Sequence, residues 1–128
     1  AEGMTDFTGP MTSWPELAPY AQSVSLPKTN VTLFTYQAGD PAAPPALLIH
    51  GLGDEADTWR HLIPALAVRQ RVVALDLPGF GRSDHPAIDY TPDFLQRTLL
   101  ELMDVLGLDD VLLIGNSLGA LLAQSLAP

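Results

Sequence analysis

The pentapeptide at residues 115–119, Gly-Asn-Ser-Leu-Gly, is the feature that most constrains how this chain folds. It has the form G-x-S-x-G and lies between two apolar stretches. The stretch before it, residues 111–114, is typical of a buried strand, and the stretch after it, residues 118–126, is typical of a helix. In that context the pattern predicts a sharp strand-to-helix turn, a nucleophile elbow, which raises the Ser117 hydroxyl above the end of the strand.

Ser117 is therefore the candidate nucleophile. A serine hydroxyl is a weak nucleophile, so it needs a base to take its proton and a geometry that presents it to a substrate. The N-terminus of the following helix would also face the negative charge that develops in such a reaction. The turn crowds the backbone two residues on either side of the serine, which explains the small residues Gly115 and Gly119. The alternative is a chance match, and the position between a strand and a helix argues against it.

Four further stretches predict strands that precede this turn. Residues 46–49 and 71–75 indicate strands buried on both faces, and residues 23–26 and 31–36 indicate an antiparallel hairpin. Strands alternate with helical patterns along the rest of the chain. We therefore expect an α/β fold, with a mostly parallel sheet of about five strands and helices on both faces.

Two helical patterns lie between these strands. Residues 92–106 carry an apolar stripe at helical spacing, and Thr91 is the expected N-cap. The other pattern covers residues 59–66, with Asp57 as the expected N-cap. Pro64 lies too deep for an unbroken helix, so we expect a kink or two short pieces.

The second chemical element is His50-Gly51-Leu52-Gly53, which follows the strand at residues 46–49. The carboxyl end of such a strand is where the ligand crevice of an α/β sheet lies. Acyl-transfer chemistry needs backbone N–H groups that hold an oxyanion, and one normally comes from the residue after the nucleophile, here Leu118. We assign the other to the amide of Leu52, because glycines on both sides let its backbone approach a substrate.

His50 itself has two interpretations. It could act as a base, but it precedes the serine, and we favour a structural histidine that braces the loop. Four residues are expected to line a pocket beside the nucleophile: His50, Gly51, Gly53 and Asn116.

The loop at residues 76–84 contains two glycines, a proline and several side-chain acceptors, which predicts a rigid turn. It could form a wall of the active-site mouth. We favour the interpretation of a scaffold, in which Asp76, Arg82 and Ser83 hydrogen-bond to the backbone. Glu101 is expected on the solvated face of its helix.

Composition narrows the class of partner. The formal net charge is −9, from 15 acidic and 6 basic residues, and no Lys/Arg cluster is present to neutralise phosphates, so we expect no nucleic-acid partner. The absence of cysteine excludes disulfides and thiolate metal sites, and we expect no metal and no organic cofactor.

No apolar window approaches the roughly 18 residues of a membrane span, and no secretory signal is seen. We therefore expect a cytoplasmic protein without a membrane partner. Residues 1–3, before Met4, suggest a cloning scar.

Taken together, these motifs resemble the α/β-hydrolase fold superfamily, over a stretch from about Val24 to the end of the chain. The chain looks like the branch that holds carboxylesterases, C–C bond hydrolases, cofactor-free haloperoxidases, epoxide hydrolases and haloalkane dehalogenases. The last two use an aspartate at the elbow, so Ser117 resembles the serine branch, and Asn116 is reminiscent of C–C bond hydrolases. The motifs that carry the resemblance are His50-Gly51-Leu52-Gly53, Trp59, residues 76–83 and residues 115–119.

The resemblance implies a serine hydrolase that acts on an ester or related small-molecule carbonyl substrate through an acyl-enzyme intermediate. Ser117 would be the nucleophile, and the amides of Leu52 and Leu118 would form the oxyanion hole. Two alternatives remain open. One is a non-catalytic α/β-hydrolase-like binding module, and the other is a cofactor-free perhydrolase or haloperoxidase, which shares the same triad.

In this family the acid and the histidine of the triad follow the serine, but no Asp, Glu or His follows Ser117 here. We therefore expect residues 1–128 to be the N-terminal part of a single α/β-hydrolase domain, inactive alone. The strand at residues 111–114 would also be left as an apolar sheet edge, which favours association. We expect the C-terminal remainder of the same protein as a second chain, after cleavage or loss of a segment near Pro128.

Overall fold

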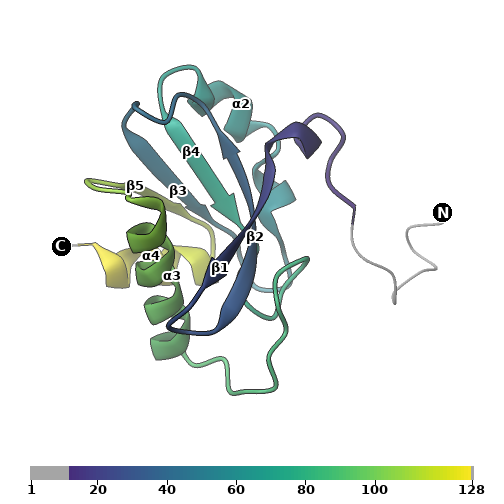
Figure 1. Ribbon diagram of the computed structural model, residues 1–128, viewed down its shortest axis with the longest axis vertical. Coiled ribbons are helices and arrows are strands. Elements are labelled where there is room, and N and C mark those ends of the chain that lie inside the picture. Colours follow the sequence, from purple (N-terminus) through teal and green to yellow (C-terminus); the bar gives the residue numbers. More distant parts are fainter. Residues whose placement is uncertain (1–11, 128) are drawn as a thin grey trace.

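The computed structural model describes residues 12–127, which form a five-stranded sheet with helices on both faces (Figure 1). The predicted α/β class is confirmed, and so is the expectation of about five strands. The expected scar at residues 1–3 lies outside the described residues. The strands are β1 (Ala21–Leu26), β2 (Val31–Ala38), β3 (Pro45–Ile49), β4 (Arg71–Leu75) and β5 (Leu112–Gly115).

The sheet is mixed, and its parallel half determines where a site can form. The strand order is β1-β2-β4-β3-β5, with β2 antiparallel to both of its neighbours and β3 parallel to both of its own. Ile49, the last residue of β3, is in register with Leu75 of β4 and Gly115 of β5. The loops after these three strands therefore leave the sheet at the same edge, where open α/β sheets bind ligands.

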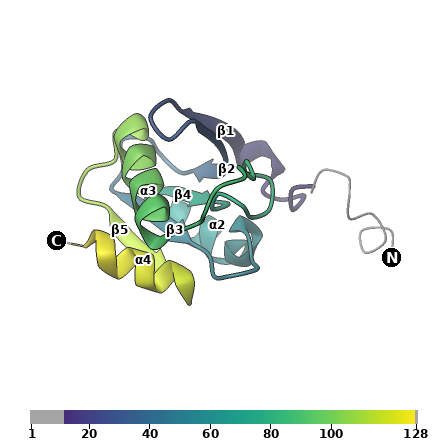
Figure 2. The same ribbon diagram turned by 90° about the horizontal axis from the view of Figure 1, so that it is seen from below.

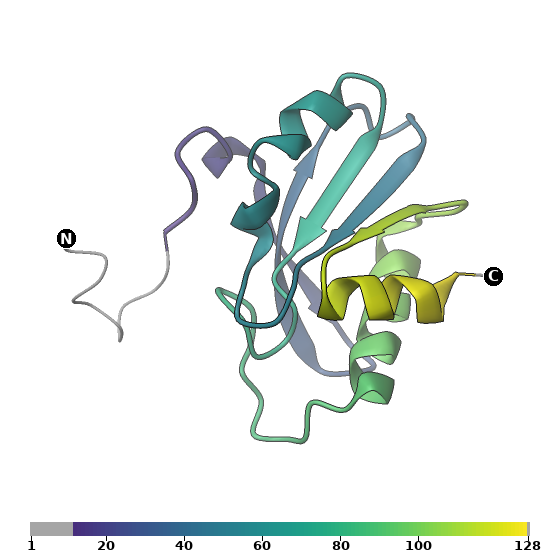
Figure 3. The same cartoon turned by 180° about the vertical axis from the view of Figure 1, so that it is seen from behind.

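Alternate side chains of the central strands face two separate core layers, as expected for strands covered on both sides. Leu47 and Ile49 of β3 belong to the layer that α3 and α4 complete, whereas Ala46 and Leu48 belong to the layer on the other face, with η2 and α2. Figures 1 and 3 show the two faces, and Figure 2 shows the strands between the layers. The described helices are η1 (Ala18–Tyr20), η2 (Ala56–Trp59), α2 (Leu62–Ala67), α3 (Pro92–Leu106) and α4 (Leu118–Leu126), of which η1 and η2 are 3-10 helices.

The helix α3 begins and ends where the sequence predicts. The Thr91 hydroxyl accepts a hydrogen bond from the Phe94 N–H at 3.1 Å, which makes Thr91 the N-cap. Gly107 ends the helix in the left-handed conformation, with φ 65°. The segment forms two short pieces, η2 and α2, as expected, but the break falls at residues 60–61. Pro64 lies in the first turn of α2, where its missing N–H costs no helical hydrogen bond. With 15 residues, α3 is the longest described helix, and none of the described helices is long and apolar enough to cross a bilayer.

The prediction of Asp57 as a helix N-cap is wrong. Asp57 lies inside η2 and is buried. Its carboxylate accepts a hydrogen bond from the Tyr36 hydroxyl and forms an ion pair with Arg82, at 3.3 Å between Nη2 and Oδ1. These partners lie about 20 residues away on either side, so the local pattern around Asp57 could not indicate them.

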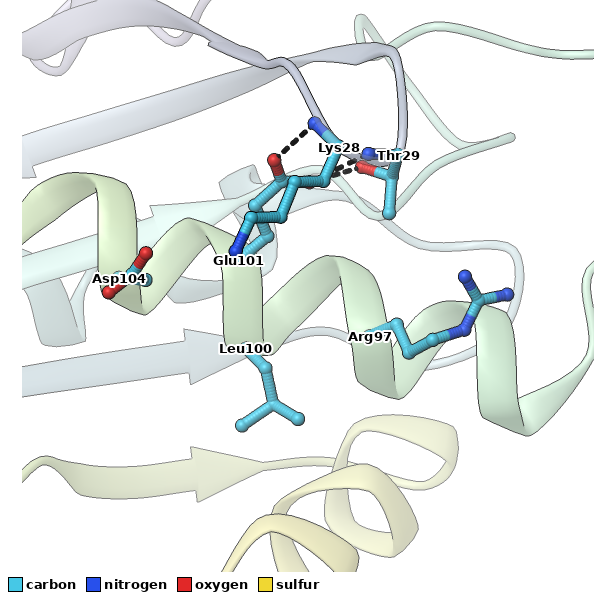
Figure 4. Close-up of a pocket in the computed structure, with 6 residues that line it drawn as sticks. All are labelled: Lys28, Thr29, Arg97, Leu100, Glu101 and Asp104. Atoms are coloured by element: carbon cyan, nitrogen blue, oxygen red, sulfur yellow. Dashed lines mark hydrogen bonds between the residues drawn. The ribbon is translucent and has the colours of Figure 1, made fainter.

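Glu101 is also placed differently from the expectation of a solvated helix face, since only 7% of it is exposed. Its carboxylate accepts hydrogen bonds from the Lys28 N–H at 2.6 Å, the Thr29 N–H at 2.9 Å and the Thr29 hydroxyl at 2.7 Å. Glu101 thereby fastens α3 to the β1–β2 turn (Figure 4). Burial alone would raise the pKa of Glu101, but the hydrogen bonds from Thr29 and Lys28 outweigh it and hold the pKa below its ordinary value.

We expect Glu101→Gln to lower the free energy of unfolding by about 2 kcal/mol at pH 7, because hydrogen bonds to a charged acceptor are lost. A folded-state pKa below the ordinary value of 4.5 means that the contribution is complete above that pH and is lost as the pH falls through the folded-state pKa. Urea titrations from pH 7 to pH 3 measure this. The control is Asp104→Asn, an exposed carboxylate on the same helix, which should change stability by less than about 0.5 kcal/mol. Equal losses in the two variants would contradict the assignment.

Candidate active site

The predicted elbow is present between β5 and α4. β5 ends at Gly115 and α4 begins at Leu118, so the chain reverses across two residues, Asn116 and Ser117. Ser117 has φ 57° and ψ −117°, a conformation that non-glycine residues rarely adopt and that costs about 1–3 kcal/mol. Its side chain is exposed. Strain of this kind persists only where the surroundings enforce it, and it is concentrated at functional sites.

The two glycines of the pentapeptide are required by backbone packing. A Cβ atom on Gly115 would lie 2.2 Å from the carbonyl oxygen of Gly119, and one on Gly119 would lie 2.0 Å from the carbonyl oxygen of Ile49. Neither distance is possible for a real side chain. The sequence-based reason for these two glycines therefore matches the geometry: the first turn of α4 lies directly against β5 and the end of β3.

The loop after β3 lies against the elbow. A Cβ atom on Gly51 would lie 3.1 Å from the Asn116 carbonyl oxygen and 3.2 Å from Cβ of Ser117. The Asn116 N–H donates to the Ile49 carbonyl at 3.2 Å, which ties the elbow to the strand end. Of the predicted pocket-lining residues, the structure thus brings Gly51 and Asn116 to Ser117. Gly53 is exposed, with φ 74° and no atom within 4 Å of the position that its Cβ would take.

The two amides predicted to form an oxyanion hole are not used by the turns around them. At the elbow the Gly119 N–H donates to the Asn116 carbonyl and the Ala120 N–H donates to the Ser117 carbonyl. Within residues 12–127, the N–H groups of Leu52 and Leu118 make no hydrogen bond to a backbone or side-chain acceptor. The Leu52 side chain is 75% exposed. Both amides are therefore free to bind an anion, and their role remains a prediction.

His50 is fully buried, so it has no exposed surface from which to line a pocket. Its Nδ1 lies 2.7 Å from the Gly51 carbonyl oxygen, and its Nε2 lies 2.8 Å from the Leu77 backbone nitrogen. Burial lowers the pKa of His50, and the Gly51 carbonyl and the charges of Asp76 and Asp54 only partly oppose that effect. These contacts fit the bracing role that the sequence favoured, and they leave neither ring nitrogen available to accept a proton from Ser117.

The loop after β4 is held by buried polar groups, as the scaffold interpretation expects. Asp76 is fully buried and accepts from the N–H of Ala56 at 2.7 Å and the N–H of Arg82 at 2.7 Å. The Ser83 hydroxyl donates to the Asp76 carbonyl and accepts from the Phe34 N–H. The backbone bonds expected of Asp76 and Ser83 are therefore present.

The Arg82 side chain departs from that expectation, because it binds side chains and not the backbone. Its guanidinium pairs with Asp76 at 2.9 Å and with Asp57 at 3.3 Å, and it lies 3.8 Å from the centroid of the Phe34 ring. Burial alone would lower the pKa of Arg82, but the hydrogen bond and charge of Asp76, together with the charge of Asp57, outweigh it and raise the pKa. Arg82 thereby connects the loop after β4 to η2, a link that the sequence analysis missed and that no local pattern signals.

The Ser117 hydroxyl has no side-chain partner in the described part of the chain. Within residues 12–127 no side chain is hydrogen-bonded to the Ser117 hydroxyl, and the two other histidines, His61 and His85, are exposed in other parts of the fold. No three His, Asp or Glu side chains of that part lie close enough together to bind a metal ion.

Of two cavities in the described part of the chain, one lies apart from the elbow and the other reaches it. One, of about 460 Å³, lies between α3 and the β1–β2 turn and contains none of the predicted site residues (Figure 4). The other, of about 450 Å³, is a groove along β5 and α4 and reaches the elbow at Gly115 and Ala120. The groove is lined by Val111, Leu112, Leu113, Gly115, Ala120, Ala123, Gln124 and Ala127.

Residues 44–128 match a protein-family model described as alpha/beta hydrolase fold. Over 79 residues the chain is 42% identical to the 2-hydroxy-6-oxo-6-(2'-aminophenyl)hexa-2,4-dienoic acid hydrolase of Metapseudomonas resinovorans, a match that covers 59% of this chain and 27% of that protein. Over 86 residues it is 40% identical to an uncharacterized protein of Mycobacterium tuberculosis, covering 67% of this chain and 25% of the relative.

Among solved structures, epoxide hydrolase A of Mycobacterium thermoresistibile is similar to this chain, with a TM-score of 0.76 and 33% identity. The similarity covers 82% of this chain and 33% of that one. The chain thus spans about a quarter of the length of the curated relatives that it matches.

We expect Gly119→Ala to lower the free energy of unfolding by about 3 kcal/mol, because the added methyl group overlaps the Ile49 carbonyl. The matched control is Gly107→Ala, where no atom lies within 4 Å and only the left-handed φ is unfavourable, at a cost of about 1 kcal/mol. Chemical denaturation of the two variants measures the difference. A Gly119 variant no less stable than the Gly107 variant would show that the contact at the elbow is not as close as described.

We expect Arg82→Ala to destabilise the protein by about 3–5 kcal/mol, because it leaves two buried carboxylates without their cation. Arg97→Ala removes an ion pair with Asp93 whose side chains are 58% and 76% exposed, and should cost less than about 1 kcal/mol. Thermal or urea unfolding compares the two variants. A loss at Arg82 no larger than that at Arg97 would contradict the role assigned to the Arg82 guanidinium.

Proposed function

The chain belongs to the α/β-hydrolase family, and on this basis we propose that it forms part of a serine hydrolase. In this proposal Ser117 attacks the carbonyl carbon of an ester or related small-molecule substrate. The observation that carries the proposal is the backbone of Ser117, which holds an exposed hydroxyl in a strained turn beside the Gly51 loop. A structural serine would have no need of that conformation.

A serine in place of an aspartate at the elbow favours acyl transfer over epoxide opening. Epoxide hydrolases and haloalkane dehalogenases of this family use an aspartate at the elbow, and the resemblance to an epoxide hydrolase structure therefore concerns the fold. A serine hydroxyl instead forms an ester with an acyl group, and the two unoccupied amides near the elbow are the groups that a tetrahedral oxyanion requires.

The reaction proceeds in two halves. As the Ser117 oxygen attacks the carbonyl carbon, its proton passes to a histidine, and the carbonyl oxygen becomes an oxyanion held by the Leu52 and Leu118 N–H groups. Collapse of this intermediate breaks the bond to the leaving group, which takes the proton from the histidine. Water then attacks the acyl-enzyme, with the same histidine as base, and releases the acid and free Ser117.

The histidine and its acidic partner come, in this proposal, from the remainder of the same protein. The groove along β5 supports this, because it exposes the edge of a strand whose other side is fully paired with β3. Leu112, which lines the groove, is 49% exposed, and Leu121 of α4 is 66% exposed. A further strand that pairs with β5 would cover this surface, as unprotected sheet edges normally require.

C–C bond hydrolysis is a second candidate, and it uses the same Ser117 with a ketone carbonyl in place of an ester. The Asn116 residue of the elbow and the 42% identity to a hexa-2,4-dienoic acid hydrolase favour it. A perhydrolase would share the same triad, whereas a binding module would keep the fold without reactivity at Ser117.

A fluorophosphonate probe applied to the full-length protein tests the proposal, because it reacts only with an activated serine. We expect one adduct, at Ser117, identified by mass spectrometry of the labelled peptide. Ser117→Ala should abolish labelling, and Ser125→Ala, which removes a hydroxyl from the following helix α4, should leave it unchanged. Absence of labelling in the wild-type protein would refute the hydrolase proposal in favour of the binding module.

A further inference from the structure

The peptide group between Gly51 and Leu52 is held firmly on one side only. Its carbonyl oxygen, on Gly51, lies 2.7 Å from Nδ1 of His50 and 3.1 Å from the backbone nitrogen of Asp54. Its N–H, on Leu52, has no partner within the described residues. In this planar peptide group the Gly51 carbonyl is therefore held in place, whereas the Leu52 N–H is unbound.

The partners of His50 assign its tautomer. The Leu77 N–H can only donate, so Nε2 of His50, 2.8 Å away, must be the unprotonated nitrogen that accepts. The Gly51 carbonyl can only accept, so Nδ1 must carry the proton. His50 has no exposed surface and packs against Phe80 in a T-shaped arrangement, with ring centroids 5.3 Å apart, so the ring cannot turn over without disturbing the core.

The geometry of the peptide group determines where the Leu52 N–H points. A trans peptide is planar, and its C=O and N–H bonds point in opposite directions. No cis peptide occurs among residues 12–127. With the Gly51 carbonyl drawn inward to His50, the Leu52 N–H must point away from the buried ring. Gly51 itself lies against Ser117, since a Cβ on Gly51 would be 3.2 Å from the serine Cβ.

We propose that His50 is a positioning residue of the oxyanion hole: its Nδ1–H holds the Gly51 carbonyl and thereby aims the Leu52 N–H at the acyl group on Ser117. This inference rests on the proposed function. It assigns His50 a role in transition-state stabilisation that goes beyond bracing the loop, because a donor contributes only when it points at the developing oxyanion. Hydrogen bonding at the carbonyl also polarises the peptide and strengthens the N–H as a donor.

Two substitutions distinguish a role of His50 in directing the Leu52 N–H from a role in holding the loop. In Asn, the side-chain NH₂ lies near the position of Nδ1, so His50→Asn keeps the donor to the Gly51 carbonyl and loses the contact with the Leu77 N–H. In Gln, the longer amide reaches the position of Nε2, so His50→Gln keeps an acceptor for Leu77 and loses the donor to Gly51. Each variant loses one buried hydrogen bond, and bracing alone predicts similar effects.

The readout is the second-order rate constant for fluorophosphonate modification of Ser117 in the full-length protein. Removal of a whole oxyanion-hole donor costs about 100- to 1000-fold. The Asp54 N–H still holds the Gly51 carbonyl in His50→Gln, so we expect a loss of about 30-fold there and of less than about 3-fold in His50→Asn. Unfolding midpoints measured in parallel show whether the two variants are equally stable.

The outcomes are distinct. Equal rates in the two variants, or a slower His50→Asn, overturn the positioning role while the serine hydrolase proposal stands. A wild-type protein that does not react at Ser117 refutes the proposed function, and the positioning role falls with it. A faster His50→Asn supports both.

A second measurement covers the case in which His50→Gln fails to fold. Nitrogen-15 NMR of the wild-type protein, with the His50 signal assigned by His50→Asn, reports the tautomer directly. We expect a neutral ring with a protonated Nδ1 and an unprotonated Nε2 at pH 7. The opposite tautomer would overturn the inference, because Nδ1 would then have no proton to donate to the Gly51 carbonyl.

Discussion

The contact between the first turn of α4 and the end of β3 is the constraint on which the rest of the structure depends. At Gly119 the two backbones approach so closely that no side chain fits between them. This contact fixes where α4 begins relative to the sheet, and so it enforces the unfavourable backbone angles of Ser117. The energy that holds the serine in place therefore comes from sheet pairing and helix packing, and the serine hydroxyl itself is left free.

Buried polar groups hold the neighbouring loops in place around this contact. His50 bridges the loops after β3 and β4, and Asp76 and Arg82 join the second of these loops to η2. Isolated buried charges would be costly, but here each carboxylate and the guanidinium have partners. The result is a rigid edge of the sheet around the elbow, although the loops themselves lack regular structure. Preorganisation of this kind is what an oxyanion hole needs, since its donors must be in place before charge develops.

Much of the fold could be predicted from the sequence, because periodicity, caps and glycines are local signals. The ends of α3 and the division of residues 56–67 into two short helices follow from such signals. The failures concern polar side chains with distant partners. Asp57 and Glu101 were assigned from their neighbours in the chain, but their carboxylates bind groups that the fold brings from far away. For the site, the sequence predicted roles for Ser117, Leu52 and Leu118, which stay predictions, and it could not show which loops hold these residues.

The most direct test of the account is a crystal structure of the full-length protein with a phosphonate bound covalently at its reactive serine. The account predicts phosphorus bonded to Oγ of Ser117, the phosphoryl oxygen at about 2.7–3.1 Å from the Leu52 and Leu118 nitrogens, and a strand paired with the outer edge of β5. An adduct on another residue, or a phosphoryl oxygen directed away from these two amides, would contradict it.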